Sequence, residues 1–227
     1  ISYINMGKYI KLFDTHSEYN TYINRQDAIF PNVSYCKDNN EVHYNPWVDK
    51  RVVLTVNVNN TTNPTQILGS GALSSITKIE IDGVEQPTVV ASYTFDTTGE
   101  HIVKCTLADP TTIPNSFIYG CNRLTNFELP ESITSIGDYA FSGDMQIFTT
   151  IRIPKNVASF GSYAFYPTGM AMKTFYLEPL VPPTASGSWI TGSYIEKIYV
   201  PAESLETYKT TTGWSAYASK IEAMPNT

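Results

Sequence analysis

Apolar residues recur along the second half of the chain at intervals of 23 to 24 positions. The segment Leu124-Thr-Asn-Phe127-Glu-Leu129-Pro130 returns near residues 148, 172 and 195 with apolar and polar positions in the same order. This alternation is typical of a short strand with one buried face. A unit of this length cannot bury that face alone, so the copies must stack into a solenoid. Three apolar columns are expected to form its core: Leu124, Phe148, Met172 and Ile195; Phe127, Ile151, Phe175 and Ile198; Leu129, Ile153, Leu177 and Val200.

The second half of each copy is repeated as well. Residues 133–141 (Ile-Thr-Ser-Ile-Gly-Asp-Tyr-Ala-Phe) match residues 157–165 (Val-Ala-Ser-Phe-Gly-Ser-Tyr-Ala-Phe), and residues 113–121 fit a degenerate first copy. The third copy departs from the pattern, because prolines replace its Ser-Ile-Gly segment. After the fourth copy, residues 202–209 predict a helix, and the segment around Trp214 would seal the open end of the stack. We therefore predict a solenoid with a C-terminal helical cap over residues 109–227.

Two further segments precede the predicted solenoid. Residues 49–108 contain about five short alternating strands separated by turn residues, which predicts a compact β-sandwich. Residues 1–48 combine a strand near residues 8–13, a helix near 15–24 and a hairpin around 37–40, which predicts a small α+β segment. The expected fold class is mainly β and multidomain.

Composition narrows the range of partners. Only 16% of the residues are charged and the net charge is -6, so no basic stripe exists to bind a nucleic-acid backbone. No apolar run approaches the roughly 20 residues that span a bilayer. The three cysteines are scattered and lack a C-x-x-C spacing, so we expect buried thiols in place of a disulfide framework. Because the chain begins at Ile1, we expect any targeting segment to lie outside it.

The sequence carries no catalytic motif. The histidines His16, His43 and His101 lie in unrelated segments, and no zinc-protease, nucleophile-elbow or phosphate-loop signature occurs. Asp38 and Glu41 lie close to His43, but acidic hairpin turns are usually solvated, so we interpret them as a turn. We predict a non-enzyme with no cofactor and no metal site.

The strand positions between the apolar columns are expected to point outward and to provide any binding surface. One outward column contains Glu128, Arg152, Tyr176 and Tyr199. Glu128 and Arg152 would be lateral neighbours able to form an exposed ion pair, and Tyr176 and Tyr199 would form a flat aromatic patch able to contact a sugar ring or a peptide. The alternative is that the two tyrosines only cover the parallel strands. This column is the candidate ligand-binding site.

The repeated phrase Leu-Thr-x-Phe/Ile-x-Leu/Ile-Pro, followed by Ser-Ile/Phe-Gly-x-Tyr-Ala-Phe, resembles the BspA-like leucine-rich repeat over about half of the chain. Residues 93–103 (Tyr-Thr-Phe-Asp-Thr-Thr-Gly-Glu-His-Ile-Val) are similar to the closing hairpin of bacterial immunoglobulin-like surface domains. The resemblance implies an extracellular or cell-surface location, cell adhesion, and a protein or glycan partner on a host or neighbouring cell. An exported bacterial surface protein is therefore the leading hypothesis.

Two alternatives belong to other functional classes. The chain could be a structural or assembly module of a larger surface or phage particle, or a non-catalytic accessory module of a larger exported protein. Fold alone does not decide among these roles.

Overall fold

The computed structural model describes residues 51–143, 150–166, 173–185, 188–190 and 195–225, and the backbone of three short strands before residue 50. The chain separates into two compact units, residues 1–50 and 51–227. The predicted boundary near residue 108 therefore lies inside the second unit.

The first unit contains a three-stranded sheet in the order β1-β2-β3, formed by Ile10–Phe13, Val33–Cys36 and Glu41–Tyr44. Strands β2 and β3 pair antiparallel, which confirms the predicted hairpin strands. Strand β1 pairs parallel to β2. The helix predicted near residues 15–24 and the side chains of Asp38, Glu41 and His43 lie outside the described part.

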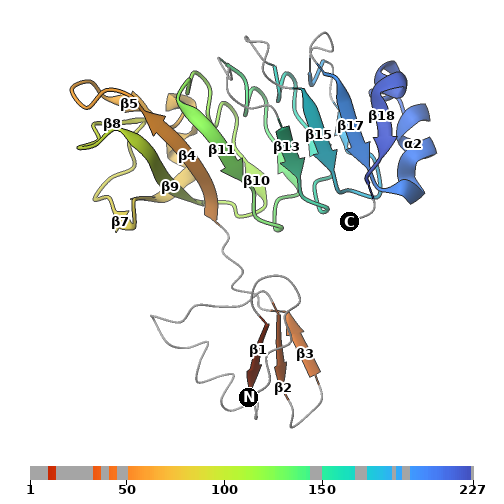
Figure 1. Cartoon of the computed structure of the whole chain (residues 1–227), viewed down its shortest axis with the longest axis horizontal. Helices are drawn as coiled ribbons and strands as arrows, with labels where there is room; N and C mark the ends of the chain where they lie inside the picture. The colour runs from red at the N-terminus through yellow and green to blue at the C-terminus, as the bar shows by residue number, and fades with distance from the viewer. Residues whose placement is uncertain are drawn as a thin grey trace. The chain divides into compact units, whose positions relative to one another are not determined.

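The second unit begins with a five-stranded sheet in the order β11-β4-β9-β6-β7 (Figure 1). Its long strand β4 alternates between buried and outward residues, because every second residue from Val52 to Val58 is apolar. A small two-stranded sheet, β5 with β8, and the short 3-10 helix η1 complete this region. The elements are β4 Arg51–Val58, β5 Thr65–Gln66, η1 Ser70–Ser75, β6 Ile76–Ile81, β7 Val84–Glu85, β8 Ser92–Tyr93, β9 Gly99–Leu107 and β11 Leu124–Glu128.

A separate immunoglobulin-like domain is not shown. Strand β11, the first strand of the predicted repeats, pairs antiparallel with β4, the first strand of the predicted sandwich. One continuous hydrophobic core runs from Val52 to Ile221. The strands predicted to form a sandwich therefore share a sheet and a core with the repeats. Alternation within a strand indicates that one face is buried, but it does not indicate what covers that face.

The repeats form two parallel sheets (Figure 1). One has the order β13-β15-β17-β18 and the other the order β10-β12-β14-β16. The predicted apolar columns are confirmed across β13, β15 and β17, since Ile151, Phe175 and Ile198 pair in register and are at most 2% exposed. The elements are β10 Thr112–Ile113, β12 Ser135–Ile136, β13 Thr150–Ile153, β14 Ser159–Phe160, β15 Thr174–Leu177, β16 Thr184–Ala185, β17 Lys197–Val200 and β18 Ile221–Ala223.

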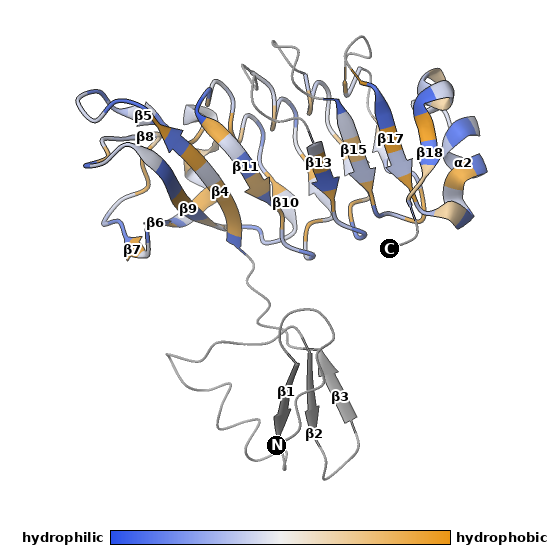
Figure 2. Cartoon of the chain, viewed as in Figure 1, coloured by the Kyte–Doolittle hydropathy of each residue, from blue (hydrophilic) through white to orange (hydrophobic). Residues whose placement is uncertain are grey.

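A stack of turns connects the coils along a third side. The Phe141 N–H donates to the Ala164 carbonyl at 2.8 Å, and the Phe165 N–H donates to the Trp189 carbonyl at 2.9 Å. The rings of Phe141 and Phe165 stack with centroids 5.2 Å apart. Figure 2 shows orange apolar and blue polar residues alternating along the strands of this unit, as one buried face requires.

A ladder of side-chain acceptors joins successive turns. Asn115 Oδ1 accepts the Asp138 N–H at 2.8 Å, and Asp138 Oδ1 accepts the Ser162 N–H at 2.7 Å. The repeated glycines Gly137 and Gly161 lie against these acceptors, where a Cβ atom would overlap the preceding turn. The glycine of the repeated phrase is therefore required for successive turns to approach each other this closely.

The C-terminal cap agrees with the prediction. It comprises η2 Ala202–Ser204, α2 Leu205–Thr210, η3 Ser215–Lys220 and strand β18. Trp214 is completely buried, and its Nε1 donates to the Pro183 carbonyl at 2.8 Å. Tyr208 is also buried and donates to the Pro179 carbonyl at 2.9 Å. These aromatic residues cover the apolar end of the last coil.

Candidate functional site

The outer face of the sheet β13-β15-β17-β18 carries a row of four side chains. Arg152 pairs in register with Tyr176, Tyr176 with Tyr199, and Tyr199 with Glu222. The alternating neighbours of these residues on each strand are buried, so the row lies on the opposite face. The structure therefore brings together Arg152, Tyr176 and Tyr199 and adds Glu222. Sequence reasoning missed Glu222 because residues 221–223 do not repeat the phrase from which the column was built.

Tyr176 and Tyr199 stack on one another, with ring centroids 4.9 Å apart and planes 23° apart. The centroid separation matches the spacing of neighbouring strands. The rings therefore face each other across the sheet and do not lie flat upon it. They present edges and hydroxyl groups, whereas the sequence predicted a flat aromatic patch.

Glu128 does not join this row. It lies on β11, where it pairs with Val53 of β4. Within the described residues no pairing between β11 and β13 is found, and Arg152 forms its ion pair with Glu178 of the next coil. The predicted Glu128–Arg152 pair is thus replaced by Arg152–Glu178. The repeat spacing placed Arg152, Tyr176 and Tyr199 in one row correctly, but it did not identify the sheet to which β11 and Glu128 belong.

Internal ion pairs balance the charges around the row. Lys197 pairs with Glu222 across β17 and β18, and the hydrogen bond that Lys197 Nζ donates to the Glu222 carboxylate raises the pKa of Lys197. Lys173 pairs with Glu196 at 2.8 Å on the adjoining loops. A ligand of this face would therefore meet paired charges on both sides of two stacked tyrosines.

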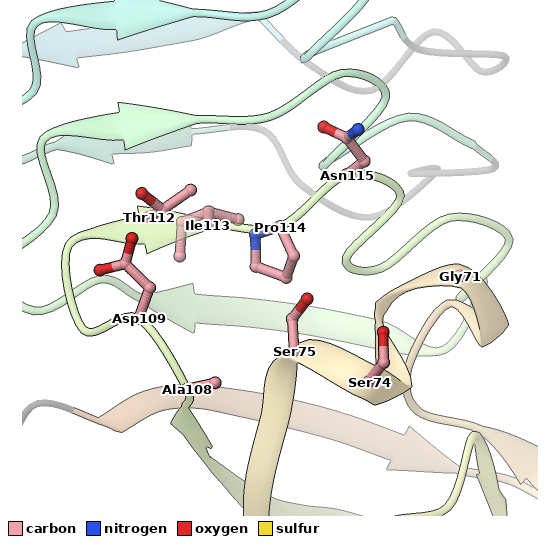
Figure 3. Close-up of a pocket in the computed structure, with 9 residues that line it drawn as sticks. All are labelled: Gly71, Ser74, Ser75, Ala108, Asp109, Thr112, Ile113, Pro114 and Asn115. Atoms are coloured by element: carbon pink, nitrogen blue, oxygen red, sulfur yellow. The ribbon is translucent and has the colours of Figure 1, made fainter.

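A separate polar depression of about 410 Å³ lies where β9 leads into β10. Figure 3 shows Ser74 and Ser75 on one side of it and Asp109 and Thr112 on the other. The carboxylate of Asp109 accepts the N–H and the hydroxyl of Thr111 at 2.9 and 2.7 Å. The only charged group of the lining is thus engaged within its own turn. In the described part of the chain, no group of three His, Cys, Asp or Glu residues could hold a metal ion.

His101 is the only histidine whose side chain the structure describes. Its Nδ1 lies 2.6 Å from Asp82 Oδ2, and its Nε2 lies 3.4 Å from the hydroxyl of Thr97. This order resembles a hydroxyl–imidazole–carboxylate triad. However, Nε2 lies closer to the carbonyl oxygen of Thr97, at 3.0 Å, than to its hydroxyl, so the imidazole does not single out the hydroxyl as the partner that a nucleophile–base pair requires. His101 thus links the turn at Asp82 to the turn at Thr97.

These features define a class: a β-solenoid of stacked repeats with an exposed strand face and a sealed C-terminal end. The model of the BspA type leucine rich repeat region, in six copies, matches residues 55–209. The match covers more than half of the chain, and the chain belongs to this family. The matched segment starts at residue 55, within β4. The family match and the shared sheet therefore both extend into the region predicted as a sandwich.

Repeats of this family are generally non-catalytic and often mediate protein binding or adhesion. Comparison with curated proteins finds no significant match. Among the described helices, none is long and apolar enough to cross a membrane.

Proposed function

We propose that this chain is part of an exported bacterial surface protein that binds a protein or glycan ligand and acts in cell adhesion. The binding surface is the strand face formed by Arg152, Tyr176, Tyr199 and Glu222. The observation that supports this surface is the register of the four residues across β13, β15, β17 and β18.

The chemistry of the row suits recognition. Tyrosine offers a large contact area with few rotatable bonds, and tyrosine and arginine are enriched among residues that dominate binding energy. The two stacked rings limit each other's rotation, so little side-chain entropy is lost when a ligand binds. The regular sheet beneath them holds the row in a fixed geometry.

The test measures binding of the purified chain to immobilised host matrix proteins and to a glycan array. The variant Tyr176→Ala/Tyr199→Ala should lose at least about tenfold in affinity, as expected when central aromatic contacts are removed. A matched control is Tyr139→Ala/Tyr163→Ala, because this pair also stacks, at 5.2 Å and 21°, but lies on the turns.

Saturable binding that is lost only in the strand-face variant supports the proposal. Binding that is equal in both variants contradicts the proposed surface. The absence of binding to either panel contradicts the proposed ligand classes. Circular dichroism of each variant shows whether the fold is retained.

A further inference from the structure

A second polar pocket lies beside the start of β11, where the loop between β4 and β5 meets the turn at residues 120–123 (Figure 1). Its volume is about 330 Å³, which is at the lower end for small-molecule sites and suits a single sugar ring. Pro64 is the only residue of the lining with a wholly apolar side chain. The side chains that dominate the lining carry amide or guanidinium groups: Asn59, Asn60, Asn63, Gln66, Asn122 and Arg123. A ligand of this pocket must therefore be hydrophilic on nearly every side.

Hydrogen bonds hold the two walls of this pocket together. Gln66 Nε2 donates to the Tyr119 carbonyl at 2.9 Å and to the Leu68 carbonyl at 3.3 Å. The Asn57 N–H donates to the Arg123 carbonyl at 2.8 Å. Strands β4 and β5 are thus both tied to the turn before β11, so the pocket is formed before a ligand binds.

The same hydrogen bonds determine which polar atoms remain for a ligand. The NH2 group of Gln66 is used by the two backbone carbonyls, so its Oε1 remains as an acceptor. Asn60 Oδ1 accepts the N–H and the hydroxyl of Thr62 at 2.7 and 2.6 Å, so its NH2 group remains as a donor. Amide donors and acceptors side by side match the hydroxyl groups of a sugar, each of which can donate and accept.

Arg123 is a cation for which the described residues provide no counter-ion. Residues 51–123 contain four lysines and arginines, and three of them, Arg51, Lys78 and Lys104, form ion pairs with glutamates. Arg123 is half-buried and forms no ion pair among the described residues, and no aspartate or glutamate lines the pocket. Guanidinium groups bind carboxylates through two parallel hydrogen bonds, so a ligand with a carboxylate would supply the missing charge.

We propose that this pocket binds a single sugar residue that carries a carboxylate. Arg123 binds the carboxylate, and Asn60 and Gln66 contact hydroxyl groups of the ring. A simple anion would leave the amide groups unused, and a peptide would place apolar groups against a polar wall. The inference extends the proposed binding function to a second site, separate from the strand face, and names an acidic glycan as its ligand.

The test is a heteronuclear NMR titration of the whole chain with methyl glucuronide and with methyl glucoside. The two sugars differ only in the carboxylate, so their comparison isolates the contribution of the charge. The Kd for methyl glucuronide should be at least about tenfold lower, because a charge-assisted hydrogen bond is roughly twice as strong as a neutral one. The resonances that shift should belong to residues 59–66 and 120–123.

Substitutions of Arg123 test its role directly. Arg123→Gln should weaken methyl glucuronide at least about tenfold, to the level of methyl glucoside, whose Kd should stay unchanged. Arg123→Lys keeps the charge but loses the planar fork, so its Kd should lie between those of the parent chain and Arg123→Gln. The matched control is Lys155→Gln, which removes another cation without an ion pair among the described residues, outside this pocket, and should change neither Kd. Melting temperatures are measured in parallel, since a loss of folding would weaken both sugars equally.

Four results would overturn the inference: no binding of methyl glucuronide, equal Kd values for the two sugars, an unchanged Kd in Arg123→Gln, and displacement of the glucuronide by an equal concentration of acetate or triglycine. The last result would reduce the pocket to a site for any small anion.

The strand-face proposal is decided separately. Tyr176→Ala/Tyr199→Ala should bind methyl glucuronide like the parent chain. If this variant loses the sugar and Arg123→Gln does not, the pocket is overturned and the strand-face proposal stands. Failure of the chain to bind matrix proteins would contradict the strand face and leave the glucuronide result unchanged.

Discussion

A Cβ atom on Gly161 would lie only 2.6 Å from the backbone nitrogen of Asp138 and closer still to its Oδ1. Asp138 belongs to the preceding coil, so this contact sets how closely two coils can approach. Gly161→Ala should therefore lower the free energy of unfolding by about 2 kcal/mol, because the turn must move apart to accommodate the methyl group. Chemical denaturation measures the change.

Gly71→Ala is the control for this prediction. A Cβ atom there would meet only the Ser116 Cβ, at an ordinary 3.6 Å. Its effect should stay within about 1 kcal/mol in either direction. Equal stability of Gly161→Ala and the parent chain would show that the coils are not held at this separation.

The Asp82–His101 pair predicts a pH-dependent contribution to stability. Burial raises the pKa of Asp82, but the hydrogen bonds from His101 and from the Ile102 N–H outweigh it and hold the pKa below its ordinary value of 3.8. The contribution is therefore complete above pH 3.8 and is lost as the pH falls through the lower folded value.

Asp82→Asn should consequently destabilise the chain by about 1 kcal/mol near pH 7, since the carboxylate is half exposed and screened. The difference should shrink below pH 3.8. Asparagine tolerates the left-handed conformation at this position, where φ is 50°, so the substitution isolates the charge. Denaturation series at several pH values, with exposed Asp96→Asn as the control, test this. A stability difference between Asp82→Asn and the parent chain that does not change with pH would refute the assignment of this contribution to the ionised Asp82 carboxylate.

Cys105 and Cys121 should be unreactive in the folded protein. Both are free and buried, and burial raises the pKa of each thiol to about 12, so the reactive thiolate is scarce at pH 8. Peptide-resolved mass spectrometry after iodoacetamide treatment should find both modified only in denaturant. Rapid alkylation of Cys105 under native conditions would contradict the described burial.

The cap should determine the stability of the last coil. Trp214→Ala removes a completely buried indole and leaves the Pro183 carbonyl without its donor, which should cost about 4 kcal/mol. Ser215→Ala, at the exposed neighbour, should change stability by less than about 0.5 kcal/mol. Thermal unfolding compares the two variants, and similar melting temperatures would show that the cap is dispensable.

The repeat period predicted the solenoid correctly, because identical spacing forces identical residues into the same columns. It placed Tyr176 beside Tyr199 and Arg152 beside Tyr176 for that reason. It could not predict that β11 joins β4, since antiparallel and parallel partners demand the same alternation within a strand. The exposure of Leu180 and Val181 also escaped prediction. It depends on the loop at residues 178–183, which has one residue more than the loop at 154–158 and whose backbone accepts hydrogen bonds from Ser204 and Trp214 of the cap. Of the predicted buried thiols, Cys105 and Cys121 are confirmed, and Cys36 lies outside the described side chains.

The acceptor ladder of Asn115 and Asp138 has a direction. Each side chain accepts a backbone N–H of the following coil, and a backbone N–H is available from any residue except proline. A coil therefore imposes its spacing on its successor without dictating the side chain at the donating position. Such an array can lengthen or shorten by whole coils over evolution while its outward residues diversify, provided that the two ends stay sealed.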